Sequence, residues 1–139
     1  MNVSLREFQV STKGFCDIVD ISDHVRNAIG DSGVSDGLAV ISVAGSTASV
    51  TTIEFEPGVV EDLKVAIERM APSGIEYRHD QRWGDGNGFA HVRAAMIGAS
   101  FTVPVSGGSP VLGTWQQVVL LDFDNRPRRR SVFVQVLGE

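Results

Sequence analysis

The sequence predicts a single α+β domain over residues 1–139, with a largely antiparallel sheet or sandwich and about three helices. Segments with strand-like patterns open and close the chain, and helical patterns lie between them without regular strand–helix alternation. The length of 139 residues suits one domain with its own core. No internal repeat or low-complexity linker divides the chain.

The N-terminal segment predicts a β-hairpin followed by a short helix. Residues 1–22 alternate apolar and polar side chains on both sides of "STKG", which is the pattern of two paired strands. Ser22 is a favourable N-cap, so a helix is expected from Asp23 to about Ile29. The glycines of "GDSG" then end it.

Two strands and a longer helix are expected next. The run "GLAVISVAG" (37–45) is short and apolar throughout, so it predicts a buried strand, and "SVTTIEFE" (49–56) predicts the strand beside it. Pro57 opens a helix, because proline suits the first turn. Four apolar residues recur at helical spacing and are expected to face the core: Val60, Leu63, Ile67 and Met70.

The second half of the chain predicts another helix and three strands. The helix "FAHVRAAMIG" begins around Gly88 and ends at Gly98, and "SFTVPV", "TWQQVVLLDFD" and "RSVFVQVLGE" follow as strands. Residues 124–127 are expected to turn between the last two strands. The basic run "RPRRR" (126–130) is most often a solvated hairpin, although it could supply phosphate contacts or a subunit contact.

Composition bears on the partners and the compartment. The net charge of −5 argues against nucleic acid as the main partner. No apolar run reaches the roughly 20 residues of a membrane span, and the N-terminal residues lack the apolar core of a signal peptide. The single cysteine, Cys16, allows no internal disulfide and favours a reducing compartment, so a cytoplasmic location is expected.

The stretch "YRHDQRWGDGNGFAHVRAA" (77–95) concentrates polar chemistry in a way that a chain reversal does not require. It holds two of the protein's three histidines, His79 and His91. Asn87 is a good N-cap, and His91 lies four residues further on, where it shares a helix face with the cap. The helix start offers free N–H groups to an anion.

The same stretch offers a close approach to a ligand and a metal-binding carboxylate. Gly84, Gly86 and Gly88 let the backbone come close to a bound molecule. Asp85 could hold a metal ion or act as a base, and His79 could fold back towards it. The alternative is a turn followed by a helix cap, with both histidines structural.

Several motifs of the chain together resemble one family. They are Tyr77-Arg78-His79, Asp85-Gly86-Asn87 with His91, Leu112-Gly113-Thr114-Trp115-Gln116, Arg128-Arg129-Arg130 and Gly138-Glu139. In this order they resemble the YjbQ-like family, also called secondary thiamine-phosphate synthase. The segment "GSTASVTTIEFEPGVVEDL" (45–63) is similar to the family's His-Thr-Thr-Ala segment and the helix after it.

Two imidazoles of the family pattern are missing from this chain. Gly45 stands where the family's His-Thr-Thr begins, and Phe89 stands at the first histidine of its His-Ala-His. The resemblance therefore implies weaker metal binding than in relatives with all the histidines, and stronger zinc binding when His is restored at position 89. Glu54 matches the family's acidic position.

The resemblance implies an activity and a set of roles. The family's reported reaction joins a pyrimidine diphosphate to a thiazole phosphate and releases diphosphate, and this chain is expected to perform it weakly. His79, His91, Asp85 and Glu54 are then the catalytic candidates, and the first three are also candidate ligands for Mg²⁺ or another divalent metal. The candidate ligand-binding residues are Thr47, Asn87, Gly88, Arg82 and Arg93.

The resemblance also implies a homotrimer with its polar site near the subunit boundary and a small anionic metabolite as ligand. Two alternatives to an enzyme stay open. One is a non-catalytic trimeric module that binds a metal or an anionic metabolite with the same residues. The other is a structural trimer that keeps only a relict of the site.

Overall fold

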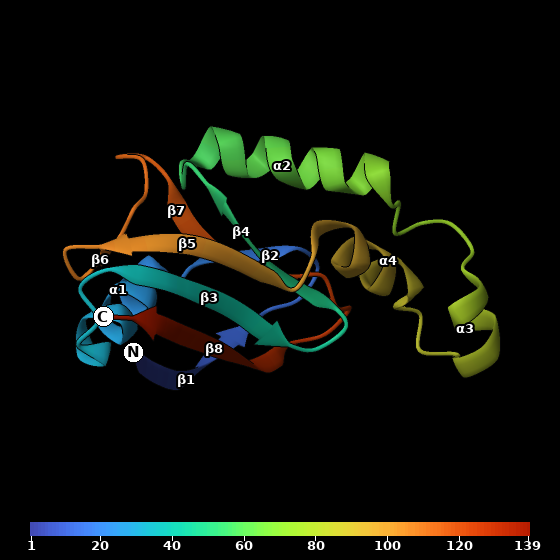
Figure 1. Cartoon of the computed structure of the whole chain (residues 1–139). Coiled ribbons are helices and arrows are strands. Elements are labelled where there is room, and N and C mark those ends of the chain that lie inside the picture. The colour runs from blue at the N-terminus through green and yellow to red at the C-terminus, as the bar shows by residue number, and fades with distance from the viewer.

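The computed structural model describes residues 1–139 and confirms the α+β class (Figure 1). The larger of two sheets has five strands in the order β1, β8, β3, β5, β6. Their bounds in that order are Asn2–Thr12, Arg128–Gly138, Gly37–Ala44, Ser100–Ser106 and Ser109–Pro110. The smaller sheet has the order β2 (Asp17–Asp20), β7 (Gln117–Asp122), β4 (Ala48–Ile53). All neighbouring strands pair antiparallel.

Strand β7 is buried on both faces and joins two apolar clusters. Val118 and Leu120 point into a cluster of 18 buried residues between the sheets, where Ile29 of α1 (Ser22–Ser32) also packs. Val119 and Leu121 point the other way, because successive side chains alternate along a strand. They pack into a cluster of nine buried residues beneath helices α2 (Pro57–Met70) and α4 (Gly88–Ile97).

Helix α2 begins at the predicted proline. The Glu56 carboxylate accepts hydrogen bonds from the N–H groups of Gly58 and Val59, which caps the first turn. Of the four apolar residues expected to face the core, Ile67 is buried and Met70 is exposed. The inward face of α2 is therefore shorter than its periodicity predicts.

The N-terminal hairpin prediction is wrong, because β1 and β2 belong to different sheets. β1 pairs with β8, and β2 pairs with β7. Phe15 and Cys16 lie between the two strands with positive φ angles of 52° and 62°. The Phe15 N–H donates to the Asp124 carbonyl, so this segment is held by the β7–β8 connection.

The predicted pairing of the strands in 37–45 and 49–56 is also wrong. β3 lies between β8 and β5 in the larger sheet, whereas β4 lies at the edge of the smaller one. The 124–127 turn likewise carries the chain from β7 in one sheet to β8 in the other. Arg126, Pro127 and Arg129 of "RPRRR" are exposed as expected, but the run is no hairpin and Arg130 at its far end is buried.

The helices differ from the sequence expectation at both ends of α1 and in one additional short helix. Helix α1 begins at Ser22, whose hydroxyl accepts from the Val118 N–H instead of capping the helix, and it runs on to Ser32. Gly33, with a φ of 73°, ends it. A short helix that the sequence did not predict, α3 (Arg78–Trp83), precedes α4.

No helix is long and apolar enough to cross a membrane.

Candidate functional site

Helices α3 and α4 meet at the end of the molecule opposite the termini (Figure 1). The Asp80 carboxylate of α3 accepts a hydrogen bond of 2.9 Å from the Gly88 N–H, the first of α4. A Cβ at Gly88 would lie 2.5 Å from the Tyr77 Cβ, so only glycine permits this approach. The first N–H of α4 therefore serves the contact between the helices, and the expectation that it is free for an anion is wrong.

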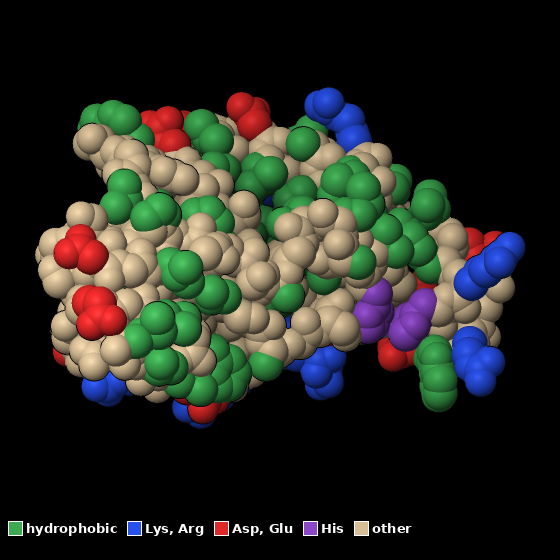
Figure 2. All heavy atoms as spheres, viewed as in Figure 1, with side chains coloured by type: hydrophobic (Ala, Val, Ile, Leu, Met, Phe, Trp, Pro, Cys, Tyr) green, Lys and Arg blue, Asp and Glu red, His purple; other side chains and the backbone are tan.

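This contact brings His79 and His91 together. Their ring centroids are 4.4 Å apart with the planes at 49°, and two histidine side chains lie side by side on the face in Figure 2. The Nε2 atom of His79 lies 3.7 Å from Asp85 Oδ2, which is too long for a hydrogen bond. This Nε2 is buried and has no hydrogen-bond partner.

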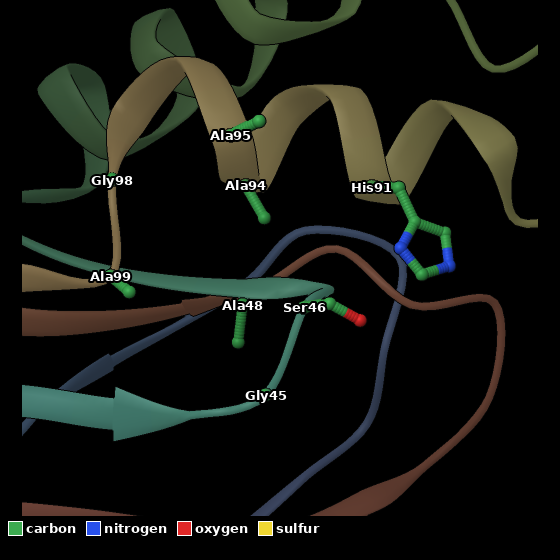
Figure 3. A pocket seen from close by; sticks show the side chains of 8 residues that line it. All are labelled: Gly45, Ser46, Ala48, His91, Ala94, Ala95, Gly98 and Ala99. Carbon is green, nitrogen blue, oxygen red and sulfur yellow. The ribbon is translucent and has the colours of Figure 1, made fainter.

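His91 also borders an open cavity of about 350 Å³, here called the α4 hollow. Short residues of α4 and of the β3–β4 connection leave this space. Figure 3 shows the His91 ring and the Ser46 hydroxyl turned towards the same end of it. The lining residues are Gly45, Ser46, Ala48, His91, Ala94, Ala95, Gly98 and Ala99. The hollow thus offers polar groups at one end and apolar walls elsewhere.

Thr47 lies next to the α4 hollow but is engaged by the scaffold. Its hydroxyl donates to Asp124 Oδ2 at 3.1 Å and accepts from Arg130 Nη2 at 2.6 Å. Arg130 also forms a two-pronged ion pair with Asp122, at 2.7 and 2.8 Å. These side chains form a buried network of two aspartates and their partners at the crossing between the sheets.

Asn87 belongs to this network and does not cap α4 with its side chain. Its Nδ2 donates to Asp124 Oδ1 at 3.2 Å, and its own Oδ1 is buried without a partner. Burial alone would raise the pKa of Asp124, but hydrogen bonds from Asn125, Asn87, Arg128 and Thr47 lower it to about 2. The predicted ligand-binding residue Asn87 therefore helps to keep Asp124 ionised.

The structure separates Arg93 from the histidine pair. Residues 91 and 93 are about 200° apart around a helix. Arg93 is buried, donates to the Ala71 carbonyl at 3.0 Å and forms an ion pair with Glu68. Its guanidinium lies 4.8 Å from the centre of the Phe89 ring. Arg93 thus fastens α4 to α2 and does not border the α4 hollow.

Arg82 and Glu54 lie in different surroundings. The Arg82 guanidinium lies 5.4 Å from the Trp83 ring centre on the exposed α3. Glu54 follows the end of β4, and this six-residue strand separates it from Thr47 by about 20 Å. It borders a second cavity of about 550 Å³ with Trp115 and Gln117, here called the Glu54 hollow.

Phe89 is a core residue and does not face the histidine pair. It belongs to the cluster of nine buried residues and lies on the Arg93 side of α4. A side chain at position 89 therefore lies on the far side of the helix from His91. The expectation that a histidine here completes a metal site does not fit this placement.

No three His, Cys, Asp or Glu side chains are arranged to hold a metal ion. His79 and Asp85 offer at most a two-residue contact beside the His91 ring. Mg²⁺ is commonly held by one or two carboxylates together with substrate phosphates and water. The residues present therefore fit an ion that arrives with a phosphorylated ligand better than a resident metal.

The sequence did not single out Ser46, Asp122 or Asp124. Ser46 lies between two apolar strand patterns, which gave no sign of a site. The two aspartates lie in the predicted strand 114–124 and were assigned to it. Because Asp122 and Asp124 are two residues apart, they share one face of that strand. Two aspartates in an apolar run indicate that a cation is buried beside them, since a buried charge needs a partner. The basic run 126–130 supplied one in Arg130.

The fold and the site define a small two-sheet α+β domain with a histidine pair where two short helices meet. The family model described as UPF0047 protein YjbQ-like matches residues 6–139, so the chain belongs to this family. The UPF0047 protein of Methanocaldococcus jannaschii is 35% identical over 136 residues, which cover 97% of this chain and 95% of the relative. That of Mycobacterium tuberculosis H37Rv is 43% identical over 115 residues, covering 83% and 84%.

Solved structures of relatives share the whole fold. A YbjQ-like protein of unknown function from Sulfolobus solfataricus P2 superposes with a TM-score of 0.93 at 34% identity, covering 99% of this chain and 98% of that one. A hypothetical protein from Aeropyrum pernix K1 gives 0.90 at 32% identity, covering 98% and 99%. The two-sheet architecture is therefore that of the family.

Proposed function

We propose that the histidine pair and the α4 hollow bind a small anionic metabolite and carry out a weak transfer reaction of the secondary thiamine-phosphate synthase type. The contact between the His79 and His91 rings beside an open cavity is the observation that carries this proposal. Two adjacent imidazoles at a cavity can bind a ligand and move a proton.

In that reaction the C–O bond between the pyrimidine methylene and the diphosphate breaks, and a C–N bond to the thiazole forms. Diphosphate leaves with the bonding electron pair. His91 lines the hollow and can donate a hydrogen bond or a proton to the leaving oxygen. His79 lies against His91, and Asp85 Oδ2 lies 3.7 Å from the His79 Nε2.

A divalent ion such as Mg²⁺ would bind with the diphosphate and neutralise its charge. Asp85 is the carboxylate of the site that can reach such an ion, because Asp122 and Asp124 are committed to arginines. The protein's own share of the chemistry is then positioning and hydrogen bonding by the histidines.

An in vitro assay with the pyrimidine diphosphate and the thiazole phosphate tests this function, beside complementation of a thiamine-auxotrophic strain. His91→Ala and Asp85→Ala should each lower the rate, by about 10²–10⁴-fold where proton transfer is lost. His24→Ala is the matched control, because this third histidine stacks on Phe8 away from the hollow. Equal activity in the wild type and both site variants would remove the site from this reaction.

A non-catalytic trimeric module for an anionic metabolite is the second candidate. It is favoured by the separation of Glu54 from His91 within one chain, which leaves fewer catalytic groups at the hollow. Tight diphosphate binding without turnover would select this candidate. A structural trimer with a relict site would show neither binding nor turnover.

A further inference from the structure

Arg130 is a buried arginine, and only two of the three nitrogens of its guanidinium donate hydrogen bonds to the protein. Its side chain is 8% exposed, and it crosses from β8 to the Asp122 carboxylate. Nε and Nη2 make the two contacts with Asp122, and Nη2 also donates to the Thr47 hydroxyl. These hydrogen bonds leave the two N–H groups of Nη1 without a protein acceptor.

The free nitrogen lies against the β3–β4 connection. A Cβ at Gly45 would lie 2.9 Å from Arg130 Nη1, and Gly45 lines the α4 hollow together with Ser46 and His91. The fully buried side-chain polar atoms without a partner are His79 Nε2 and Asn87 Oδ1. Nη1 is not one of them, so it keeps contact with solvent.

The negative charges around Arg130 lie on one side of its guanidinium. Asp122 is on the Nε and Nη2 side of the guanidinium, and the Asp124 carboxylate lies 3.9 Å from Nη2. Nη1, next to Gly45, is therefore the guanidinium nitrogen that pairs with neither carboxylate. Arginine is the preferred cation for phosphate because its N–H groups match the spacing of phosphate oxygens.

We propose that Gly45 leaves open a phosphate-binding subsite formed by Arg130 Nη1, the Ser46 hydroxyl and His91. This inference rests on the proposed function and deepens it, since it places the phosphate end of the ligand at the Gly45 end of the α4 hollow. The Arg130 guanidinium, the His91 ring and the Ser46 hydroxyl would then all donate hydrogen bonds to the phosphate. Ser46 and His91 face that end of the hollow in Figure 3.

Binding of inorganic phosphate and of diphosphate, measured by calorimetry on the full chain, tests the subsite without any turnover. Gly45→Ala inserts a Cβ 2.9 Å from Nη1 and should weaken both affinities by about tenfold or more. Ser46→Ala should weaken them as well. The matched control is Gly33→Ala at the end of α1, which also has a positive φ but where an added Cβ meets nothing within 4 Å, and its affinities should equal those of the wild type.

Nuclear magnetic resonance of ¹⁵N-arginine-labelled wild type gives a second readout that does not depend on folding of a variant. The Arg130 guanidinium signals should shift on titration with inorganic phosphate, while those of Arg93 stay unchanged. Unshifted Arg130 signals, or full affinity in a folded Gly45→Ala protein, would overturn the subsite. Phosphate binding that follows this pattern without synthase turnover would retain the subsite and reject the catalytic function. Turnover that depends on His91 but not on Gly45 would retain the catalytic function and reject the subsite.

Discussion

Asp124 is a fully buried carboxylate that keeps its negative charge. Its folded-state pKa of about 2 lies below the ordinary value of 3.8, so folding favours the ionised form. The resulting stabilisation is complete above about pH 4 and is lost as the pH falls towards 2, which amounts to about 2 kcal/mol. The pKa of Asp122 is lowered as well, because hydrogen bonds from Arg130, Thr12 and the Asp124 N–H outweigh its burial.

We therefore predict that the free energy of unfolding decreases between pH 4 and pH 2. Asp124→Asn removes one of the groups responsible and leaves Arg128 without its carboxylate. This variant should lose about 3–5 kcal/mol at pH 7 and should depend less on pH below 4. Urea unfolding at pH 7, 4 and 2.5 measures both quantities. A wild-type curve that is flat below pH 4 would contradict the assigned pKa.

A histidine at position 89 should not build a metal site. The Phe89 side chain is buried beneath the Arg93 guanidinium, on the side of α4 away from His91. We predict that Phe89→His leaves zinc affinity unchanged and lowers stability by about 1–3 kcal/mol, because it buries a polar ring. Val92→His, on the exposed face of α4, is the stability control. Calorimetric zinc titration showing a clear gain in Phe89→His would refute this placement.

At the scale of elements, the sequence predicted α4 and the importance of residues 77–95 but missed α3. Six residues with no buried side chain give no apolar periodicity to detect. The helix exists because Asp80 binds the start of α4 and because Gly84 ends it with a φ of 74°. His79 therefore meets His91 through the contact between α3 and α4. The sequence showed that polar residues are concentrated in 77–95, but it did not show this contact.

The α3–α4 contact depends on the missing side chain of Gly88. Gly88→Ala places a Cβ 2.5 Å from the Tyr77 Cβ, so α3 must move. We predict a loss of about 1–3 kcal/mol and weaker cross-relaxation between the His79 and His91 rings by nuclear magnetic resonance. Gly74→Ala, where an added Cβ meets nothing within 4 Å, should change neither. Unchanged ring contacts in Gly88→Ala would show that α3 is held by other means.

At the scale of the whole molecule, the class of fold was predictable and the strand pairing was not. Strand patterns reveal which residues alternate between faces, but they do not reveal which sheet a strand enters. The short connections after β1, β3 and β7 look like hairpin turns, and each one crosses between the two sheets. The crossings place Arg130 and Asp124 in a buried network, and charge alone does not distinguish the buried Arg130 from the exposed Arg126 and Arg129 of the same run.

The same architecture leaves apolar side chains uncovered on β1, which lies at an edge of the larger sheet. Val3 and Leu5 share one face of this strand and are 64% and 57% exposed. An exposed apolar edge strand is a natural contact for another chain. We propose that this face is covered by a second copy of the chain in a homotrimer.

We predict that light scattering at micromolar concentration gives three times the 14.9 kDa of one chain. Leu5→Glu should shift this mass towards that of a monomer, because an interfacial charge without a partner is costly. Ser11→Glu adds the same charge at the other end of the same strand, where the exposed Ser11 pairs with Arg129, and should keep the wild-type mass. A monomeric wild type would contradict the trimer and would leave Glu54 in a different hollow from His91. A trimer that survives Leu5→Glu would instead place the interface elsewhere, and the exposed Val92 and Met96 of α4 are the next positions for this test.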